Sequence, residues 1–151
     1  MLSAANLAPS WKNSQTPRFY VATGEKSKDA VREALPEFNR KNSENASAYI
    51  VTTVVLNRSG FDKDGTAVTE IGNGWGYYDL GLNNMALLLK ATELGISTLV
   101  MGIRDGEKLR KEFDIPETEA VVSVIAVGYT DSKIVRPKRK SVEDFAKFYE
   151  E

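Results

Sequence analysis

The sequence predicts a single α+β domain, in which a mixed, mostly antiparallel sheet of about four strands carries helices on both faces. Residues 49–56 and 120–129 are apolar, β-branched runs, which are typical of strands covered on both sides. Helical patterns separate the strand patterns, and the connections mix hairpin and crossover lengths, which favours a mixed sheet. The 151 residues, 42% of them hydrophobic, suffice for one core and show no second domain, so we assign residues 1–151 to a single domain.

The first half of the chain alternates short strand and helix patterns. Pro9 and Pro17 bound a polar loop, and a run rich in β-formers follows it as far as Gly24. Ser27 is placed to cap a helix that Pro36 stops. The predicted elements are the end of a helix over residues 1–7, a loop over 9–17, a strand over 18–23, a helix over 27–35, a helical turn at 38–39, a polar loop over 41–47 and a strand over 49–56.

The second half contains the strongest helix signal. Apolar residues repeat every three or four positions between Tyr77 and Leu94, and Gly95 is placed to end that helix. Ser141 and Asp144 resemble a capping box that opens a last helix. The predicted elements are a polar excursion over residues 57–73, a helix over 77–94, a strand over 97–101, a helix over 105–113 capped by Asp105, a strand over 120–129 and a helix from residue 141 onward.

Composition excludes several classes of function. The chain has no cysteine and no histidine, so it has no Ser-His-Asp triad, no Cys-His nucleophile and no zinc site of the usual ligands; no metal site is expected. An enzyme of this composition takes its difficult chemistry from a bound cofactor. No apolar run reaches about 18 residues, and the first ten residues carry no Lys or Arg. We therefore expect a cytoplasmic protein with no membrane span.

Charge is unevenly distributed along the chain. Four of the 20 basic residues fall within residues 136–140, so the rest of the chain, with all 21 acidic residues, carries a net charge of −5. One basic run on an acidic body indicates a local anion site. The sequence contains neither GxGxxG nor GxxxxGK[ST], so the known phosphate-binding turns between strand and helix are not available.

Four segments could together bind a flat, anionic ligand. The loop over residues 9–15 offers neutral donors and acceptors from Ser10, Asn13 and Gln15. Gly102 follows a strand and precedes a helix, where backbone N–H groups can face a ligand. The basic run could hold a phosphate, and the aromatic residues of segment 74–78 could wall a planar ring. Each segment also has a plain structural explanation, namely a self-capping loop, an ordinary turn, a solvated charge run or core packing.

The order of these segments resembles the FMN-dependent nitroreductase family. Residues 9–19 (Pro-Ser-Trp-Lys-Asn-Ser-Gln-Thr-Pro-Arg-Phe) are similar to its Pro-Ser-x-x-Asn-x-Gln-Pro-Trp-x-Phe loop, with Thr-Pro-Arg in place of Pro-Trp. Residues 79–102 resemble its central helix and Leu-Gly-x-x-Thr strand, and residues 116–144 its C-terminal third. The arginine-rich segment with which family members begin has no counterpart here. Either this sequence lacks the natural beginning of the protein, or the protein is a shortened member, in which case the phosphate would rest on residues 136–140 alone.

The resemblance implies a nitroreductase-like three-layer sandwich that forms a homodimer with FMN at the subunit interface. NADH or NADPH would reduce the flavin, and nitroaromatics, quinones or related acceptors would reoxidise it in a ping-pong scheme. Backbone amides at Gly102, the implied catalytic position, would approach flavin N5, while Lys138 and Arg139 would hold the phosphate. The implied cofactor-binding residues are Ser10, Trp11, Asn13, Gln15, Asn39, Lys41, Met101, Gly102, Lys138 and Arg139.

Two other interpretations remain open at this stage. One is a non-catalytic flavin-binding or scaffold protein of the same fold, in which NAD(P)H does not reduce the bound flavin. The other is a nucleic-acid contact through the basic run. The net charge of −5 elsewhere and the lack of a basic–aromatic surface motif argue against the second, so we expect no nucleic-acid partner.

Overall fold

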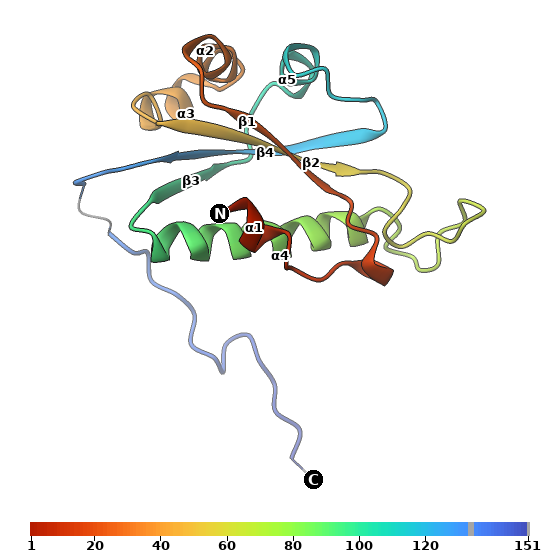
Figure 1. The fold of residues 1–151 in the computed structure, drawn as a ribbon. Helices are drawn as coiled ribbons and strands as arrows, with labels where there is room; N and C mark the ends of the chain where they lie inside the picture. Colours follow the sequence, from red (N-terminus) through yellow and green to blue (C-terminus); the bar gives the residue numbers. More distant parts are fainter. Residues whose placement is uncertain (133–134, 151) are drawn as a thin grey trace.

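The computed structural model describes residues 1–132 and 135–150 and shows a sheet between two layers of helices (Figure 1). The predicted strands and helices before residue 130 are confirmed with bounds that differ by at most three residues. The elements are α1 (Leu2–Ala5), the 3₁₀ turn η1 (Trp11–Asn13), β1 (Pro17–Ala22), α2 (Glu25–Glu33), α3 (Glu37–Asn42), β2 (Ala48–Val55), α4 (Gly74–Glu93), β3 (Ser97–Met101), α5 (Gly106–Glu112) and β4 (Glu119–Gly128).

The sheet has four strands in the order β1-β2-β4-β3. Its three neighbouring pairs are all antiparallel, which confirms the mostly antiparallel sheet and shows no parallel pair among the described strands. The two apolar runs of the sequence form the inner strands β2 and β4, and the six middle residues of β2 are buried. β1 and β3 are therefore the edge strands.

Helices α2, α3 and α5 cover one face of the sheet, while α1 and α4 cover the other (Figure 1). Side chains of a strand alternate between faces, so β2 contributes to two separate cores. Tyr49 and Val51 pack with Leu109 on the α2/α5 side. Ile50 packs with Leu87 on the α4 side. The three predicted layers are thus present, each face of the sheet with its own hydrophobic core.

Of the three helix caps predicted before residue 130, two are confirmed. The Asp105 carboxylate accepts the N–H of Lys108 at 3.0 Å at the start of α5, and Gly95 adopts a positive φ of 69° just after α4. The predicted cap at Ser27 is wrong. Helix α2 begins two residues earlier, and the Ser27 hydroxyl donates to the carbonyl of Gly24 at 2.9 Å.

Residues 135–150, here called the C-terminal arm, extend away from the body on the α4 side instead of forming the predicted last helix (Figure 1). A single turn forms, in which the Ser141 N–H donates to Asp144 at 3.0 Å, as in half of a capping box. Phe145 and Phe148 are each 71% exposed. Because most helical stability comes from packing an apolar face, this turn does not extend into a helix without a surface to cover it.

Candidate functional site

The segment Ser10–Gln15, here called the N-terminal loop, has an unusual backbone. Lys12, Asn13 and Gln15 all have positive φ values, of 46°, 55° and 48°. Side chains other than glycine disfavour this left-handed region, although asparagine tolerates it better than most. Such conformations persist where surrounding contacts hold them, and they concentrate at ligand sites.

The contacts that hold the N-terminal loop converge on a buried carboxylate. The backbone N–H of Trp11 donates to both oxygens of Asp79 in α4, each at 3.1 Å. The hydroxyl of Ser59 donates to Asp79 Oδ2 at 2.5 Å. The same hydroxyl lies 2.6 Å from Ser14 Oγ and 3.1 Å from Thr16 Oγ1. The loop is thus tied to α4 and to the segment that follows β2.

Aromatic side chains from two distant segments meet beside this loop. The rings of Trp11 and Trp75 lie 4.8 Å apart between centroids, and those of Trp75 and Tyr78 lie 5.8 Å apart edge to face. The indole N–H of Trp75 donates to Thr69 Oγ1 at 2.8 Å, whereas the buried indole N–H of Trp11 has no partner in the described chain. Trp11 and the aromatic residues of segment 74–78 are far apart in the sequence, and the fold places them together.

Two polar side chains of the N-terminal loop, those of Asn13 and Gln15, remain available to a ligand. Asn13 and Gln15 are exposed, and their side-chain amides make no hydrogen bond within residues 1–132 and 135–150. Ser10 Oγ accepts the N–H of Gln15 at 3.0 Å. A hollow of about 360 Å³ adjoins Ser10 and Gln15, between α1, β1 and α4, and Arg18 and Asn83 also line it.

A second candidate cluster lies after β3. The side-chain amide of Asn39 in α3 donates to the carbonyl of Ile103 at 3.0 Å. Gly102 is exposed, and a Cβ there would meet nothing within 4 Å. In the described part of the chain, neither Gly102 nor Ile103 donates its backbone N–H. Met101 is 2% exposed, so only its backbone can face a ligand, and Lys41 is exposed on α3.

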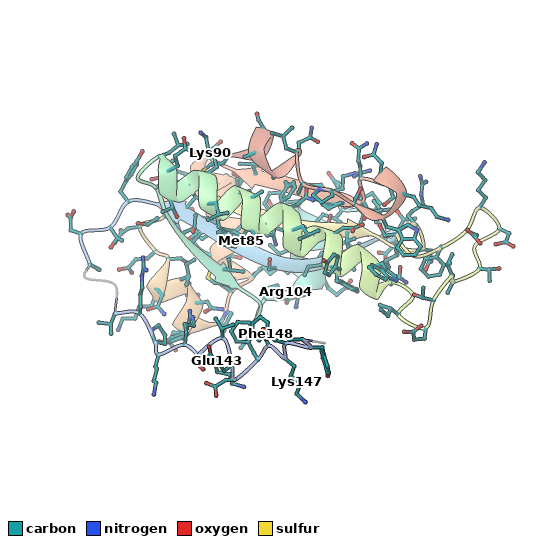
Figure 2. The ribbon with its side chains drawn as sticks, turned by 90° about the horizontal axis from the view of Figure 1, so that it is seen from below. Met85, Lys90, Arg104, Glu143, Lys147 and Phe148 are labelled. Atoms are coloured by element: carbon teal, nitrogen blue, oxygen red, sulfur yellow. The ribbon has the colours of Figure 1, made fainter. Side chains whose placement is uncertain are left out.

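Arg104 brings a positive charge to this second cluster. Its guanidinium donates to the carbonyl of Val121 and, at 3.2 Å, to the carbonyl of Gly102. Its Nε is buried and unpartnered within the described residues. Figure 2 labels Arg104 as seen from the α4 side of the molecule.

The structure does not bring all predicted site residues together. The N-terminal loop precedes β1 and Gly102 follows β3, which are opposite edges of the sheet. Three inter-strand spacings of about 4.8 Å separate these edges by about 14 Å. Lys138 and Arg139 lie on the C-terminal arm, which points away from both clusters (Figure 1). One chain therefore presents two separate candidate clusters, here called half-sites, and a basic segment apart from both.

Sequence reasoning missed Ser59, Asp79 and Arg104. Asp79 carries a signal that could have revealed it, because it is the one charged residue in the segment 74–89 and sits beside the apolar stripe of the helix. Ser59 and Arg104 carry no such signal, since their roles depend on contacts with Asp79 and with β4.

Another buried carboxylate lies outside the site and provides a comparison. Glu119, 6% exposed at the start of β4, accepts hydrogen bonds from the hydroxyls of Tyr20 at 3.0 Å and Thr53 at 2.5 Å. Tyr20 packs against the core on the α2/α5 side, away from the N-terminal loop. Burial, with a further contribution from the hydrogen bond to Glu119, raises the pKa of Tyr20 to about 12.

Comparisons with known proteins agree with this fold. Residues 1–129 match the Nitroreductase family. A nitroreductase family protein from Streptococcus pneumoniae TIGR4 is 21% identical, with 98% of this chain and 86% of that chain covered and a TM-score of 0.82. An enone reductase of gut-bacterial fatty acid saturation is 19% identical (97% and 83% covered, TM-score 0.83). An oxidoreductase containing FMN is 25% identical (97% and 77% covered, TM-score 0.78).

No curated protein sequence matches the chain. Among the helices of the described residues, none has both the length and the apolar character that crossing a membrane requires.

Proposed function

The chain belongs to the nitroreductase family, and from this premise we propose that it is a flavin-dependent oxidoreductase that binds FMN. It transfers electrons from NADH or NADPH to nitroaromatic, quinone or related acceptors. One observation carries the proposal. The family match spans both the N-terminal loop and the Gly102 segment, and within the described residues each of these segments leaves hydrogen-bonding groups without protein partners.

The groups present suit a planar ring with an anionic tail. The side-chain amides of Asn13 and Gln15 can each donate and accept, so they can bind the polar edge of the ring without adding charge. Gly102 has no side chain and open space around it, so its backbone can approach the ring closely. Lys138 and Arg139 are exposed cations suited to a phosphate.

Bound FMN would supply the hydride and electron transfer, chemistry that belongs to the cofactor and needs neither of the residues this chain lacks, cysteine and histidine. The residues would bind and orient the ring. The backbone N–H groups of Gly102 and Ile103 would donate to the edge of the ring that carries N5. The guanidinium of Arg104, held against the Gly102 carbonyl at 3.2 Å, favours negative charge at this end of the site.

We also infer that the functional unit is a homodimer. The two half-sites lie at opposite edges of one sheet, and an isologous pair can place the N-terminal loop of one copy beside Gly102 of the other. The outer face of α4 fits such an interface, since Tyr78, Met85 and Leu89 are 60%, 52% and 58% exposed along one side of the helix. Figure 2 looks onto this face and labels Met85.

The C-terminal arm supports the same assembly. It exposes Phe145 and Phe148, and Figure 2 shows Phe148 on the arm outside the helical layer. A second copy would offer the apolar surface that one chain lacks. In that arrangement the cations Lys138 and Arg139, carried on the same arm, can reach a site shared between the copies.

The proposal is tested by cofactor retention followed by turnover. The protein is purified without added cofactor, incubated with FMN, passed through gel filtration and examined by visible absorption. We expect oxidised flavin to elute with a dimer-sized peak. Steady-state assays with NADH or NADPH and a quinone or nitroaromatic acceptor should then give the parallel double-reciprocal lines of a ping-pong scheme.

Two outcomes contradict parts of this proposal. If neither NADH nor NADPH reduces the bound flavin, the proposed oxidoreductase activity is refuted and a flavin-binding scaffold protein is favoured. A protein that retains no FMN after gel filtration, and shows no saturable change in flavin fluorescence, would refute the flavin site itself.

A further inference from the structure

Asp79 is a buried carboxylate to which the proposed chemistry gives no role. It lies in the second turn of α4 and is 2% exposed. No Lys or Arg in the described chain lies within ion-pair distance of it. A buried charge without a counter-ion is costly unless hydrogen bonds compensate it, so the partners of Asp79 indicate what the residue is for.

All the donors to this carboxylate come from the N-terminal loop or from a residue bound to it. The Trp11 N–H is shared equally between the two oxygens, and the Ser59 hydroxyl donates to Oδ2. Ser59 in turn contacts Ser14 within the loop and Thr16 just after it. The carboxylate therefore holds the start of the loop directly, through the Trp11 N–H, and the end of the loop through the Ser59 hydroxyl. Hydrogen bonds to a charged acceptor are the strong ones.

The loop requires such support because of its own backbone. Lys12, Asn13 and Gln15 have left-handed backbone conformations. Residues other than glycine keep such conformations only where surrounding contacts hold them. Two of these three residues, Asn13 and Gln15, carry the free amides of the half-site. Any relaxation of the loop would redirect these side chains.

We propose that Asp79 is a positioning residue, whose carboxylate holds the N-terminal loop in its left-handed conformation and thereby sets the affinity of the protein for flavin. This inference rests on the proposed function. Without Asp79 the loop would have to be ordered at the moment of binding, and that ordering would reduce affinity.

Glu119 provides the matched control. It is also buried and also accepts two protein hydrogen bonds, but its partners Tyr20 and Thr53 lie in the sheet and face the α2/α5 core. Asp79→Ala and Glu119→Ala both remove a buried acceptor. Both should lower the thermal unfolding midpoint, whereas only the first should affect the loop.

The test titrates each folded apoprotein with FMN, well below its unfolding midpoint, and follows flavin fluorescence. We expect Asp79→Ala to raise the Kd for FMN about tenfold or more, as the loss of one charge-assisted hydrogen bond from the pre-ordered state would do. Glu119→Ala should leave the Kd within about twofold of the wild type, a difference of about 0.4 kcal/mol at most. Asp79→Asn should fall between, because its amide can accept the Trp11 N–H and donate to Ser59.

A second measurement reports the conformational stability of the N-terminal loop directly. Amide hydrogen exchange of the Trp11 N–H in the apoprotein should be slow in the wild type and Glu119→Ala and fast in Asp79→Ala. If Asp79→Ala does not fold, Asp79→Asn and Ser59→Ala carry the test, and both should raise the Kd and speed exchange at Trp11.

The outcomes distinguish the positioning role of Asp79 from the proposed function. Tight FMN binding by the wild type and by every Asp79 variant that folds would overturn the role of Asp79 and leave the proposed function intact. Unchanged exchange at Trp11 in those variants would overturn the positioning role whatever the flavin result. A wild type without measurable FMN affinity would refute the proposed function, and with it the link from Asp79 to flavin.

Discussion

Helix α4 approaches the inner strand β2 at Gly76, where the packing leaves no room for a side chain. A Cβ at Gly76 would lie 2.8 Å from Cγ2 of Val54. A Cβ at Gly81, five residues along the same helix, would meet nothing within 4 Å. We therefore expect Gly76→Ala to leave the protein less stable than Gly81→Ala, although the two changes are chemically identical.

The magnitude follows from the contact itself. Each substitution gains about 1 kcal/mol of helix propensity, so the difference between the variants isolates the steric cost. Carbon atoms pack at about 3.5–4.0 Å, so Val54 would have to shift by roughly 1 Å. Val54 is 1% exposed in an inner strand and has little freedom to move. Overpacking of this kind costs about 1–3 kcal/mol, which corresponds to an unfolding midpoint about 2–12 °C lower for Gly76→Ala.

Thermal and urea unfolding followed by circular dichroism would measure this difference. Gly81 lies on the exposed side of α4, where we propose a dimer interface, so the midpoints should be compared at several protein concentrations. Equal stability of the two variants across that range, or a more stable Gly76→Ala, would refute the close approach of α4 to β2.

Three further predictions concern the assembly, the phosphate and the partly buried hydroxyl of Tyr20. Met85→Lys places a charge on the outer face of α4, so gel filtration should show a monomer that retains its helical circular dichroism but has lost FMN. Lys138→Ala combined with Arg139→Ala should raise the Kd for FMN about tenfold and leave that for riboflavin, which has no phosphate, unchanged. Burial and the hydrogen bond to Glu119 raise the pKa of Tyr20 from 10.0 to about 12, so its contribution to stability is complete below about pH 10 and lost as the pH rises through 12. Urea unfolding between these pH values should therefore show a steeper loss of stability in the wild type than in Tyr20→Phe.

Each of these predictions has a contrary result. A Met85→Lys protein that remains a dimer would place the interface elsewhere. An equal loss of riboflavin and FMN affinity would show that Lys138 and Arg139 act on the ring or on folding rather than on the phosphate. Parallel pH profiles for the wild type and Tyr20→Phe would mean that Tyr20 does not carry the alkaline transition.

The sequence was sufficient for most of the fold because the strongest signals are local. The apolar runs at 49–56 and 120–129 became β2 and β4, and the heptad-like pattern before Gly95 became α4. The prediction of the last helix was wrong because that helix depends on contacts that are not local. The apolar pattern around Phe145 and Phe148 is present, but a helix of that length depends on a surface outside the chain's own body.

The site was predictable only in pieces. The loop with Ser10, Asn13 and Gln15 and the Gly102 turn could be read locally, because neutral amides and a glycine after a strand have recognisable uses. The contact between Trp11 and Asp79 joins residues 68 positions apart, so no local pattern reports it. The separation of the half-sites depends on the strand order, which places the first and third strands of the sequence at opposite edges.

That strand order also governs how the chain can be assembled during its synthesis. Of the four described strands, β4 is the last to leave the ribosome, yet it is the one that joins β2 to β3. Until residue 128 has emerged, β3 has no partner in the sheet and β2 is paired on one side only, so both present open backbone edges and uncovered apolar faces. The four-stranded sheet can therefore form completely only after β4 has emerged. Its exposure to aggregation and to chaperones is set by the time needed to translate those last segments.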